Sequence, residues 1–293
     1  MTDLHYEFTG ETKVNWAGVT LHRIRATRDL PRFVVSAGDE GGWVEDTKNL
    51  YGDAWVSGDA EVYGNARVYG DARVYGDAEV YGDARVYGNA EVYGDAEVSG
   101  DAWVYGDAEV YGDAEVSGDA RVYGNAWVYG DAWVYGDAEV SGDARVYGDA
   151  WVYGDAWVYG DARVYGNARV YGNARVYGNA RVSGNARVSG NARVSGNARV
   201  SGNARVSGNA DYMHLITCTS LRLITTLFKE KNGKHTIKMG CWSGTVDELE
   251  ALFKRDEWVD TSGDDADEAR EEMLALCQVF RARIARWGSE PES

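Results

Sequence analysis

The stretch Ala66-Arg67-Val68-Tyr69-Gly70-Asp71 is one unit of a hexapeptide that repeats from Leu50 to Ala210 without a change of register, 27 times in all. The consensus is Val-(Tyr/Ser)-Gly-(Asp/Asn)-Ala-X, in which X is Arg, Glu or Trp. Ala66 and Val68 are two residues apart, so in a strand they face the same side and Arg67 faces the other. Gly70 permits a positive φ and Asp71 tolerates a turn. Each unit therefore predicts a short half-buried strand followed by a corner.

Strands this short bury their apolar face only when coils stack into a solenoid. A strict six-residue period with glycine in every unit excludes a helix, whose period is 3.6 residues. Three units per coil predict an all-β solenoid, a triangular prism of about nine coils that is ~43 Å tall at ~4.8 Å per layer. A coil of two units remains the alternative.

Three units per coil would stack positions that are 18 residues apart on the outside of the rod. One outward column then reads Glu61, Glu79, Glu97, Glu115, Trp133, Trp151, Arg169, Arg187, Arg205. A second column reads Trp55, Arg73, Glu91, Glu109, Trp127, Arg145, Arg163, Arg181, Arg199. A corner column carries the tyrosine ladder Tyr51, Tyr69, Tyr87, Tyr105, Tyr123. Such ladders either only stiffen the rod, at ~0.5–1.5 kcal/mol per stacked pair, or belong to an aromatic binding surface, whose candidates are Trp133, Trp151 and Trp157.

The repeat resembles the left-handed parallel β-helix that is built from hexapeptides of the form aliphatic-X-X-X-small-X, and this resemblance implies the left hand. A second resemblance lies in the leader, in residues 21–29, in Gly38-Asp39-Glu40-Gly41-Gly42-Trp43-Val44-Glu45, and in Asn49-Leu50. These segments, and more loosely residues 240–248, look like uncharacterised hexapeptide-repeat proteins of bacteriophages and prophages. The resemblance implies a phage association and no particular activity.

Charge is distributed unevenly along the array, although the whole chain has a formal net charge of −17. Residues 53–162 hold sixteen Asp and seven Glu against five Arg, whereas residues 163–210 hold eight Arg and no acid. The basic end is a candidate binding site for an anionic ligand or an acidic protein surface: Arg163, Arg169, Arg175, Arg181, Arg187, Arg193, Arg199 and Arg205. The alternative is a trace of repeat expansion, because residues 183–206 are four identical units.

The two ends of the chain differ from the array. Residues 1–49 predict a β-rich cap, with a strand at Leu21–Ala26 and with Trp43 and Val44 opening the first coil. Residues 211–293 predict a small α+β module that caps the other end. Its predicted strands are 215–219, 221–229 and 235–239, with a hairpin turn at Asn232-Gly233. Its predicted helices run from a capping box at Thr245 and Glu248 to about Trp258, and from Asp265 to Trp287 with an apolar face of Leu274, Cys277, Val279, Phe280 and Ile284.

The chemistry of the known enzymes with hexapeptide helices is missing from the array. The acyltransferases of that fold use a histidine and loops that break the array, and the carbonic anhydrases use several histidines, but residues 50–210 contain none. His235 and Cys241 formally permit a nucleophile and base pair. The three cysteines have no metal-ligand spacing, so we expect no metal and no cofactor, and a reducing compartment.

These observations predict a non-catalytic structural or interaction rod, phage-associated, that forms a homo-oligomer through its end modules. The alternative is a binding protein that captures an anionic or nucleotide-like small ligand, and a weaker alternative is an acyltransferase-like enzyme. Residues 1–7 have no apolar signal region and no segment reaches the ~20 apolar residues of a membrane span, so we expect the host cytoplasm or a virion, with no membrane partner. The negative net charge disfavours non-specific nucleic-acid binding, and we also expect no specific nucleic-acid partner.

Overall fold

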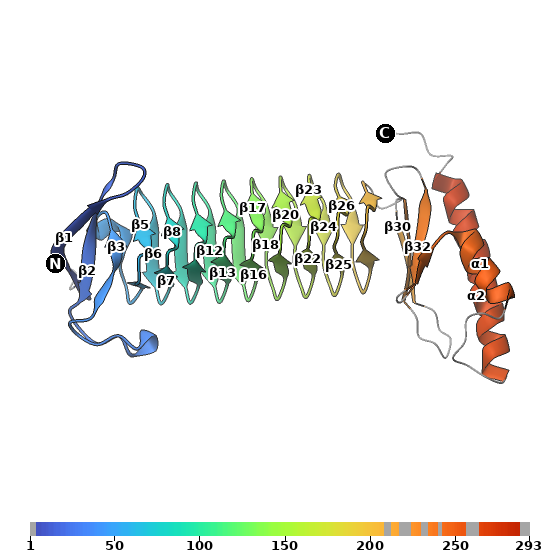
Figure 1. Cartoon of the computed structure of the whole chain (residues 1–293), viewed down its shortest axis with the longest axis horizontal. Helices are drawn as coiled ribbons and strands as arrows, with labels where there is room; N and C mark the ends of the chain where they lie inside the picture. The colour runs from blue at the N-terminus through green and yellow to red at the C-terminus, as the bar shows by residue number, and fades with distance from the viewer. Residues whose placement is uncertain are drawn as a thin grey trace.

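The protein is a straight β-solenoid with a module at each end (Figure 1). The computed structural model describes residues 4–207, 212–216, 224–229, 234–239, 242–255 and 264–287. Cα partners in the solenoid are 18 residues apart, as in the pairing of Val62 with Val80, so three hexapeptides make one coil and the two-unit alternative is wrong. The outward columns predicted from this spacing are confirmed.

Three parallel sheets form the sides of the prism. The first sheet continues the antiparallel strands β1 (Tyr6–Val14) and β2 (Thr20–Ala26). After β3 (Glu40–Val44) it runs through β5 (Glu61–Val62), β8 (Glu79–Val80), β11 (Glu97–Val98), β14 (Glu115–Val116), β17 (Trp133–Tyr135), β20 (Trp151–Tyr153), β23 (Arg169–Tyr171), β26 (Arg187–Val188) and β29 (Arg205–Val206). We call the outward column of β5 to β29 face A.

The other two sheets hold the remaining strands of each coil. Face B is the outward column of β4 (Trp55–Val56), β7 (Arg73–Gly76), β10 (Glu91–Gly94), β13 (Glu109–Gly112), β16 (Trp127–Tyr129), β19 (Arg145–Tyr147), β22 (Arg163–Tyr165), β25 (Arg181–Val182) and β28 (Arg199–Val200). Face C is that of β6 (Arg67–Gly70), β9 (Arg85–Gly88), β12 (Trp103–Gly106), β15 (Arg121–Gly124), β18 (Glu139–Val140), β21 (Trp157–Val158), β24 (Arg175–Val176) and β27 (Arg193–Val194).

The core of the rod consists of the alanines and valines of the repeat, and each of them from Ala54 to Val206 has 0% exposure. The corner glycines have positive φ, for example +70° at Gly130, which is the conformation that the sequence predicts. A Cβ there would lie 3.0 Å from the backbone nitrogen of Gly148 in the next coil, so stacking also requires glycine. The inward and outward assignment of the hexapeptide is therefore confirmed.

The N-terminal strands cover the first coil, as expected. Val44 pairs with Val62, so the solenoid begins in β3, before the repeat itself. Two short 3₁₀ helices follow β2 and β3, at Pro31–Phe33 and Thr47–Asn49. Tyr6, Ile24 and Phe33 join the core of the rod. Trp55 departs from the expected pattern: it occupies an outward X position but is 1% exposed, because the cap covers it.

The C-terminal module is an antiparallel sheet with two helices on one side (Figure 1). Its strands are β30 (Tyr212–Ile216), β31 (Ile224–Lys229), β32 (His235–Met239) and β33 (Trp242–Gly244), paired in that order. The helices are α1 (Val246–Lys254) and α2 (Asp264–Trp287). The predicted turn at Asn232-Gly233 and the predicted end of the first helix at Trp258 lie outside the described residues.

The sheet of this module covers the last coil, which confirms the predicted second cap. Phe228 of β31 is part of the apolar core of the rod, and β31 contacts β28 and β29. Lys238 Nζ donates a hydrogen bond to Ser201 Oγ at 2.9 Å. On the opposite side of the sheet, Leu227 and Ile237 pack with the helices. The apolar face of α2 is as predicted except for Val279, which is 46% exposed. Met273, which the prediction did not include, is buried.

Candidate interaction surface

The tryptophans that the sequence singles out lie on two different faces. Trp133 and Trp151 are neighbours on face A, with ring centroids 5.3 Å apart and planes 6° from parallel. Trp157 lies on face C and so does not join them. Trp133 and Trp157 are 38% and 40% exposed, which makes them the most exposed aromatic side chains of the array, just above Tyr51 at 37%. The aromatic surface is therefore a stacked pair plus a separate ring.

Trp151 and Trp157, which lie next to the basic end of the rod, each have a guanidinium group over the indole ring. Arg169 lies 4.4 Å from the ring centre of Trp151, and Arg175 lies 4.9 Å from that of Trp157. A cation over an indole face is attracted by the negative face of the ring. These contacts hold the two arginine side chains along the rod.

The eight candidate arginines of the basic end occupy all three faces, as the spacing of 18 residues per coil predicts. Face A carries Arg169, Arg187 and Arg205 in adjacent coils. Face B carries Arg163, Arg181 and Arg199, and face C carries Arg175 and Arg193. Directly stacked like charges repel one another, so this end would gain from a partner with negative charge. The arginines surround the rod and do not converge on one pocket.

Glutamates of the acidic end accept hydrogen bonds from tyrosines in the corner of the preceding coil. Tyr63 Oη donates to Glu79 Oε2 at 2.9 Å, and Tyr81 Oη donates to Glu97 Oε2 at 3.1 Å. Burial, together with the nearby Glu91 carboxylate, raises the pKa of Tyr75 to about 12 in the equivalent pair on face B. These tyrosine hydroxyls are therefore protonated donors at neutral pH.

Glu115 lacks such a donor because the corresponding corner position is Ser99. Burial and the neighbouring Glu97 raise the pKa of the Glu115 carboxyl. Beside it, Ser117, Trp133 and Tyr135 complete a small depression on face A. The depression exists because the tyrosine ladder of this corner is interrupted at Ser99 and Ser117, between Tyr81 and Tyr135.

The N-terminal hairpin reaches over the first coils of face A, which the sequence does not predict. Lys13 Nζ lies 2.9 Å from Glu61, and Asn15 Nδ2 donates to the same carboxylate. Trp16 Nε1 donates to Glu79 Oε2 at 2.9 Å, although its ring is 73% exposed. The turn-forming Asn15-Trp16-Ala17-Gly18 marks a loop but does not indicate where it packs. The hairpin thus occupies the acidic column at its N-terminal end.

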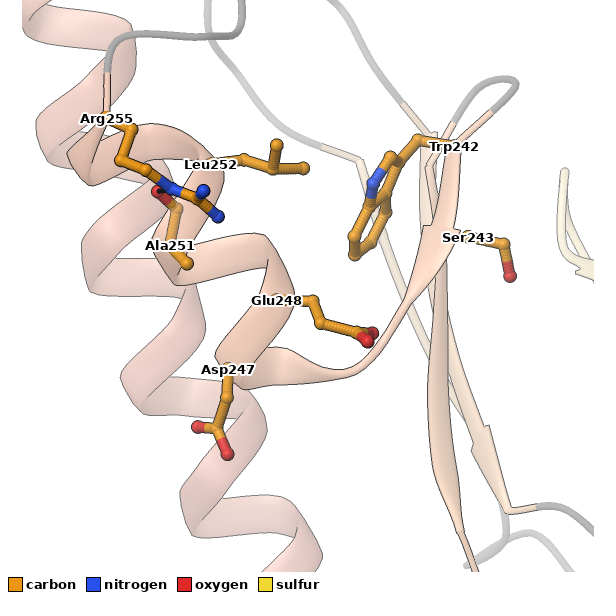
Figure 2. A pocket seen from close by; sticks show the side chains of 7 residues that line it. All are labelled: Trp242, Ser243, Asp247, Glu248, Ala251, Leu252 and Arg255. Carbon is orange, nitrogen blue, oxygen red and sulfur yellow. Dashed lines mark hydrogen bonds between the residues drawn. The ribbon is translucent and has the colours of Figure 1, made fainter.

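A separate pocket lies in the C-terminal module, between β33 and α1. Figure 2 shows Trp242 facing Leu252 and Arg255 across the opening, with Glu248 at one side. The Glu248 carboxylate completes the predicted capping box, since it accepts from the Thr245 backbone at 2.7 Å. These hydrogen bonds lower the pKa of Glu248. The carboxylate is engaged in holding the helix start, which is a structural role.

The remaining reactive side chains are dispersed. Cys277 of α2 is buried, and burial raises the pKa of its thiol to about 11, so the thiol is un-ionised at neutral pH. His5 is buried in the N-terminal cap with Nε2 2.7 Å from the Ala54 carbonyl oxygen. Burial lowers its pKa. Cys218 and Cys241 lie outside the described residues, so the pairing of His235 with Cys241 is not tested.

In the parts of the chain that the structure describes, no group of three or more His, Cys, Asp or Glu side chains is placed to hold a metal ion. Among the same residues, no helix has the length and apolar character needed to cross a membrane.

A family model described as the YdcK beta solenoid repeat matches twelve stretches of the array, most of them overlapping, which lie within residues 60–82, 114–136, 138–154 and 156–210. No curated protein matches the sequence at a significant level. The similarity is confined to the repeat, where the structure has its stacked three-strand coils. The chain is a β-solenoid repeat protein.

Proposed function

We propose that the chain is a non-catalytic rod that acts by interaction, holding two end modules apart and assembling with other protein molecules. The observation that carries this proposal is the unbroken succession of coils of one length. Residues 55–206 contain no loop that departs from the 18-residue coil, and the outward X position of each unit holds only Arg, Glu or Trp. Catalysis generally requires a position that differs from its neighbours and places an acid, base or nucleophile in a pocket.

The two ends support the assembly part of the proposal. Both terminal layers of the solenoid are covered by other strands, which protects their edges from uncontrolled pairing. Specific contacts then fall to the end modules and to the sides of the rod. The resemblance of residues 21–50 to hexapeptide-repeat proteins of bacteriophages supports a phage setting, either in a particle or in the host cytoplasm.

A binding protein for an anionic or nucleotide-like ligand is the second candidate. The observation that favours it is the pairing of guanidinium with indole at Arg169 and Trp151 and at Arg175 and Trp157. An anion bound there would meet a positive charge beside an aromatic surface. An acyltransferase-like enzyme is the weaker third candidate, and only turnover would support it.

Native mass spectrometry of the purified protein over a range of concentrations separates these functions. The interaction rod predicts masses at whole multiples of 32.1 kDa, with the fraction of oligomer rising with concentration. A monomer that retains an additional small mass, lost in high salt, would contradict the proposal and favour the ligand-binding protein.

A further inference from the structure

Face A differs from the other two faces in the order of its charges. From the first coil to the last it reads four glutamates, two tryptophans and three arginines: Glu61, Glu79, Glu97, Glu115, Trp133, Trp151, Arg169, Arg187, Arg205. Acidic and basic blocks therefore lie on opposite sides of an aromatic centre. Such a column is complementary to itself when it is turned end for end.

We infer that two copies of this chain pair antiparallel through face A, about a two-fold axis that passes between the coils of Trp133 and Trp151. The symmetry places Trp133 of one copy opposite Trp151 of the other. It then places Glu115 opposite Arg169 and Glu97 opposite Arg187, and each pair occurs twice. An isologous contact of this kind closes on itself, so it gives a dimer and not a fibre.

The inference rests on the proposed function, that the rod acts by assembly, and it adds a surface beyond the end modules. Parallel pairing of the same faces is excluded on electrostatic grounds. It would place Glu115 against its own copy and Arg169 against its own copy along the whole column, and like charges placed opposite one another are unfavourable. Complementary charge also steers the encounter toward the antiparallel register.

The other two faces have less of this complementarity. The corresponding two-fold axis on face B also places unlike charges opposite one another, Glu109 with Arg163 and Glu91 with Arg181. It nevertheless places Arg73 opposite Arg199, and its centre holds Trp127 opposite Arg145 in place of two indoles. Face C carries one acid among its outward side chains: Arg67, Arg85, Trp103, Arg121, Glu139, Trp157, Arg175 and Arg193. Face A therefore fits a second copy best, because it places no like charges opposite one another and has two stacked indoles at its centre.

Apart from Arg169, which lies over the ring of Trp151, the side chains needed for pairing remain accessible on the isolated rod. Within the described part of the chain, the side chains of Glu115 and Arg187 have neither a hydrogen bond nor an ion pair. Glu97 uses one oxygen for Tyr81, and the other is open. Glu61 and Glu79 are held by the N-terminal hairpin, so the contact runs from Glu97 to Arg187. The hairpin marks one end of the interface.

The size of this surface indicates a weak dimer. Six coils from Glu97 to Arg187 span ~29 Å at ~4.8 Å per layer. One side of so narrow a prism gives an interface at the low end of specific protein contacts, at roughly 1,000 Å² in total. Exposed ion pairs contribute little individually to the stability of a dimer. Trp133 and Trp151 of the two copies, four rings in all, therefore supply the desolvated centre, and the charges set the antiparallel direction. We expect a dimer that weakens as salt rises.

Sedimentation velocity of the full chain at low and high salt, with a charge swap, tests the inference. Glu115→Arg and Arg169→Glu each place like charges opposite one another, and each should weaken the dimer roughly tenfold or more. The double variant restores opposite charges in both pairs and should recover the wild-type dissociation constant to within roughly threefold. This recovery is specific to the antiparallel register.

Two matched controls separate pairing from effects within one chain. Arg145 lies 4.5 Å from the ring centre of Trp127 on face B, so Arg145→Glu loses the same kind of internal contact as Arg169→Glu but leaves face A intact. Trp157→Ala removes a ring from face C that is about as exposed as that of Trp133, so it is the control for Trp133→Ala on face A. Both controls should dimerise like the wild type. Circular dichroism melts check that every variant folds.

Each outcome decides the inference. A dimer that is lost in the single variants and regained in the double variant supports it. An oligomer that is unchanged by the face A variants overturns it while leaving the proposed interaction rod in place, with the end modules as the assembly elements. A chain that stays monomeric at every concentration and salt overturns it together with the self-assembly that it rests on.

Discussion

The acidic stretch of the rod, residues 53–162, and its basic stretch, residues 163–207, have the same backbone and the same core. Val134 and Val188 are both fully buried, and the corner glycines have positive φ in both stretches. The two stretches differ only in the outward X position, the corner Tyr or Ser, and the Asp or Asn that follows glycine. The comparison teaches that Ala, Val and Gly specify this fold, while the other three positions of the hexapeptide can change without altering it.

The surface difference nevertheless affects stability along the rod. The acidic stretch has stacked tyrosines, such as Tyr111 with Tyr129 at 4.8 Å, and carboxylates that accept from tyrosine hydroxyls. In the basic stretch the tyrosine ladders give way to Ser183 and the serines beyond it, and arginines stack on arginines. We therefore expect the basic stretch to open at lower free energy than the acidic stretch, as a separate local unit.

The shared core gives the largest expected effect. Val134→Asp in the acidic stretch and Val188→Asp in the basic stretch each place an unpaired charge in a dry core, at a cost of several kcal/mol. Trp133→Ser, one residue away and outward, should cost less than about 1 kcal/mol. Urea denaturation followed by circular dichroism measures all three. Tolerance of the aspartate in the basic stretch alone would show that the two cores are not equivalent.

The corner glycines give the next largest effect and separate conformational strain from close stacking. Gly196 has φ +63° and, among the described residues, no atom within 4 Å of where a Cβ would lie, so Gly196→Ala should cost about 1–2 kcal/mol from the left-handed backbone. At Gly130 the Cβ would also press on Gly148, 3.0 Å away, which should add about 1–3 kcal/mol. Equal losses of stability in the two variants would mean that the backbone conformation dominates and that coils can adjust their spacing.

Most of the fold could be predicted from the hexapeptide because its information is local and is repeated. A period of six residues with alternating small and branched side chains defines the strand, and stacking of identical units defines the columns, so Glu115 could be placed beside Trp133 without a structure. Val279 was wrongly placed on the buried side of its helix, because a single amphipathic segment has no repetition to correct its phase.

The candidate surface could be predicted only in part. The positions of the arginines and of Trp133, Trp151 and Trp157 follow from the coil arithmetic. The burial of Trp55 and the hydrogen bond from Trp16 to Glu79 do not, because they depend on how a cap of unrelated sequence folds back on the rod. Long-range contacts between a non-repeating segment and a repeat leave no periodic signal in the sequence.

Tyrosine introduced at corner positions that now carry serine should extend the stacked ladders, with a smaller effect on stability than the core and glycine variants. Ser141 lies in the corner column between Tyr123 and Tyr159, so Ser141→Tyr should form two new stacks at ~0.5–1.5 kcal/mol each. Ser183 has Tyr165 on one side and Ser201 on the other, so Ser183→Tyr should form one. Thermal melts should therefore rise more for the first variant than for the second. Equal gains would indicate that the ladders contribute through burial of single rings and not through stacking.

The smallest expected effect concerns the carboxylate of Glu115 and its dependence on pH. Its pKa in the folded rod is raised above 4.5 by burial and by Glu97, so the protonated form is favoured by folding. The stability that this group contributes is present at low pH and is lost as the pH rises through the folded pKa. Glu115→Gln should therefore stabilise the isolated rod at pH 7, by a few tenths of a kcal/mol, and should have no advantage at pH 3.

Glu79→Gln is the matched control in the same column, and its expected sign is opposite. The Glu79 carboxylate accepts from both Tyr63 and Trp16, so the amide, a weaker acceptor, should lower stability at pH 7. Denaturation at pH 3 and pH 7, at a protein concentration where the chain is monomeric, measures both variants. Because charge-assisted hydrogen bonds offset the stacking of like charges at Glu79 but not at Glu115, a stabilising Glu79→Gln would show that repulsion along the column outweighs those bonds.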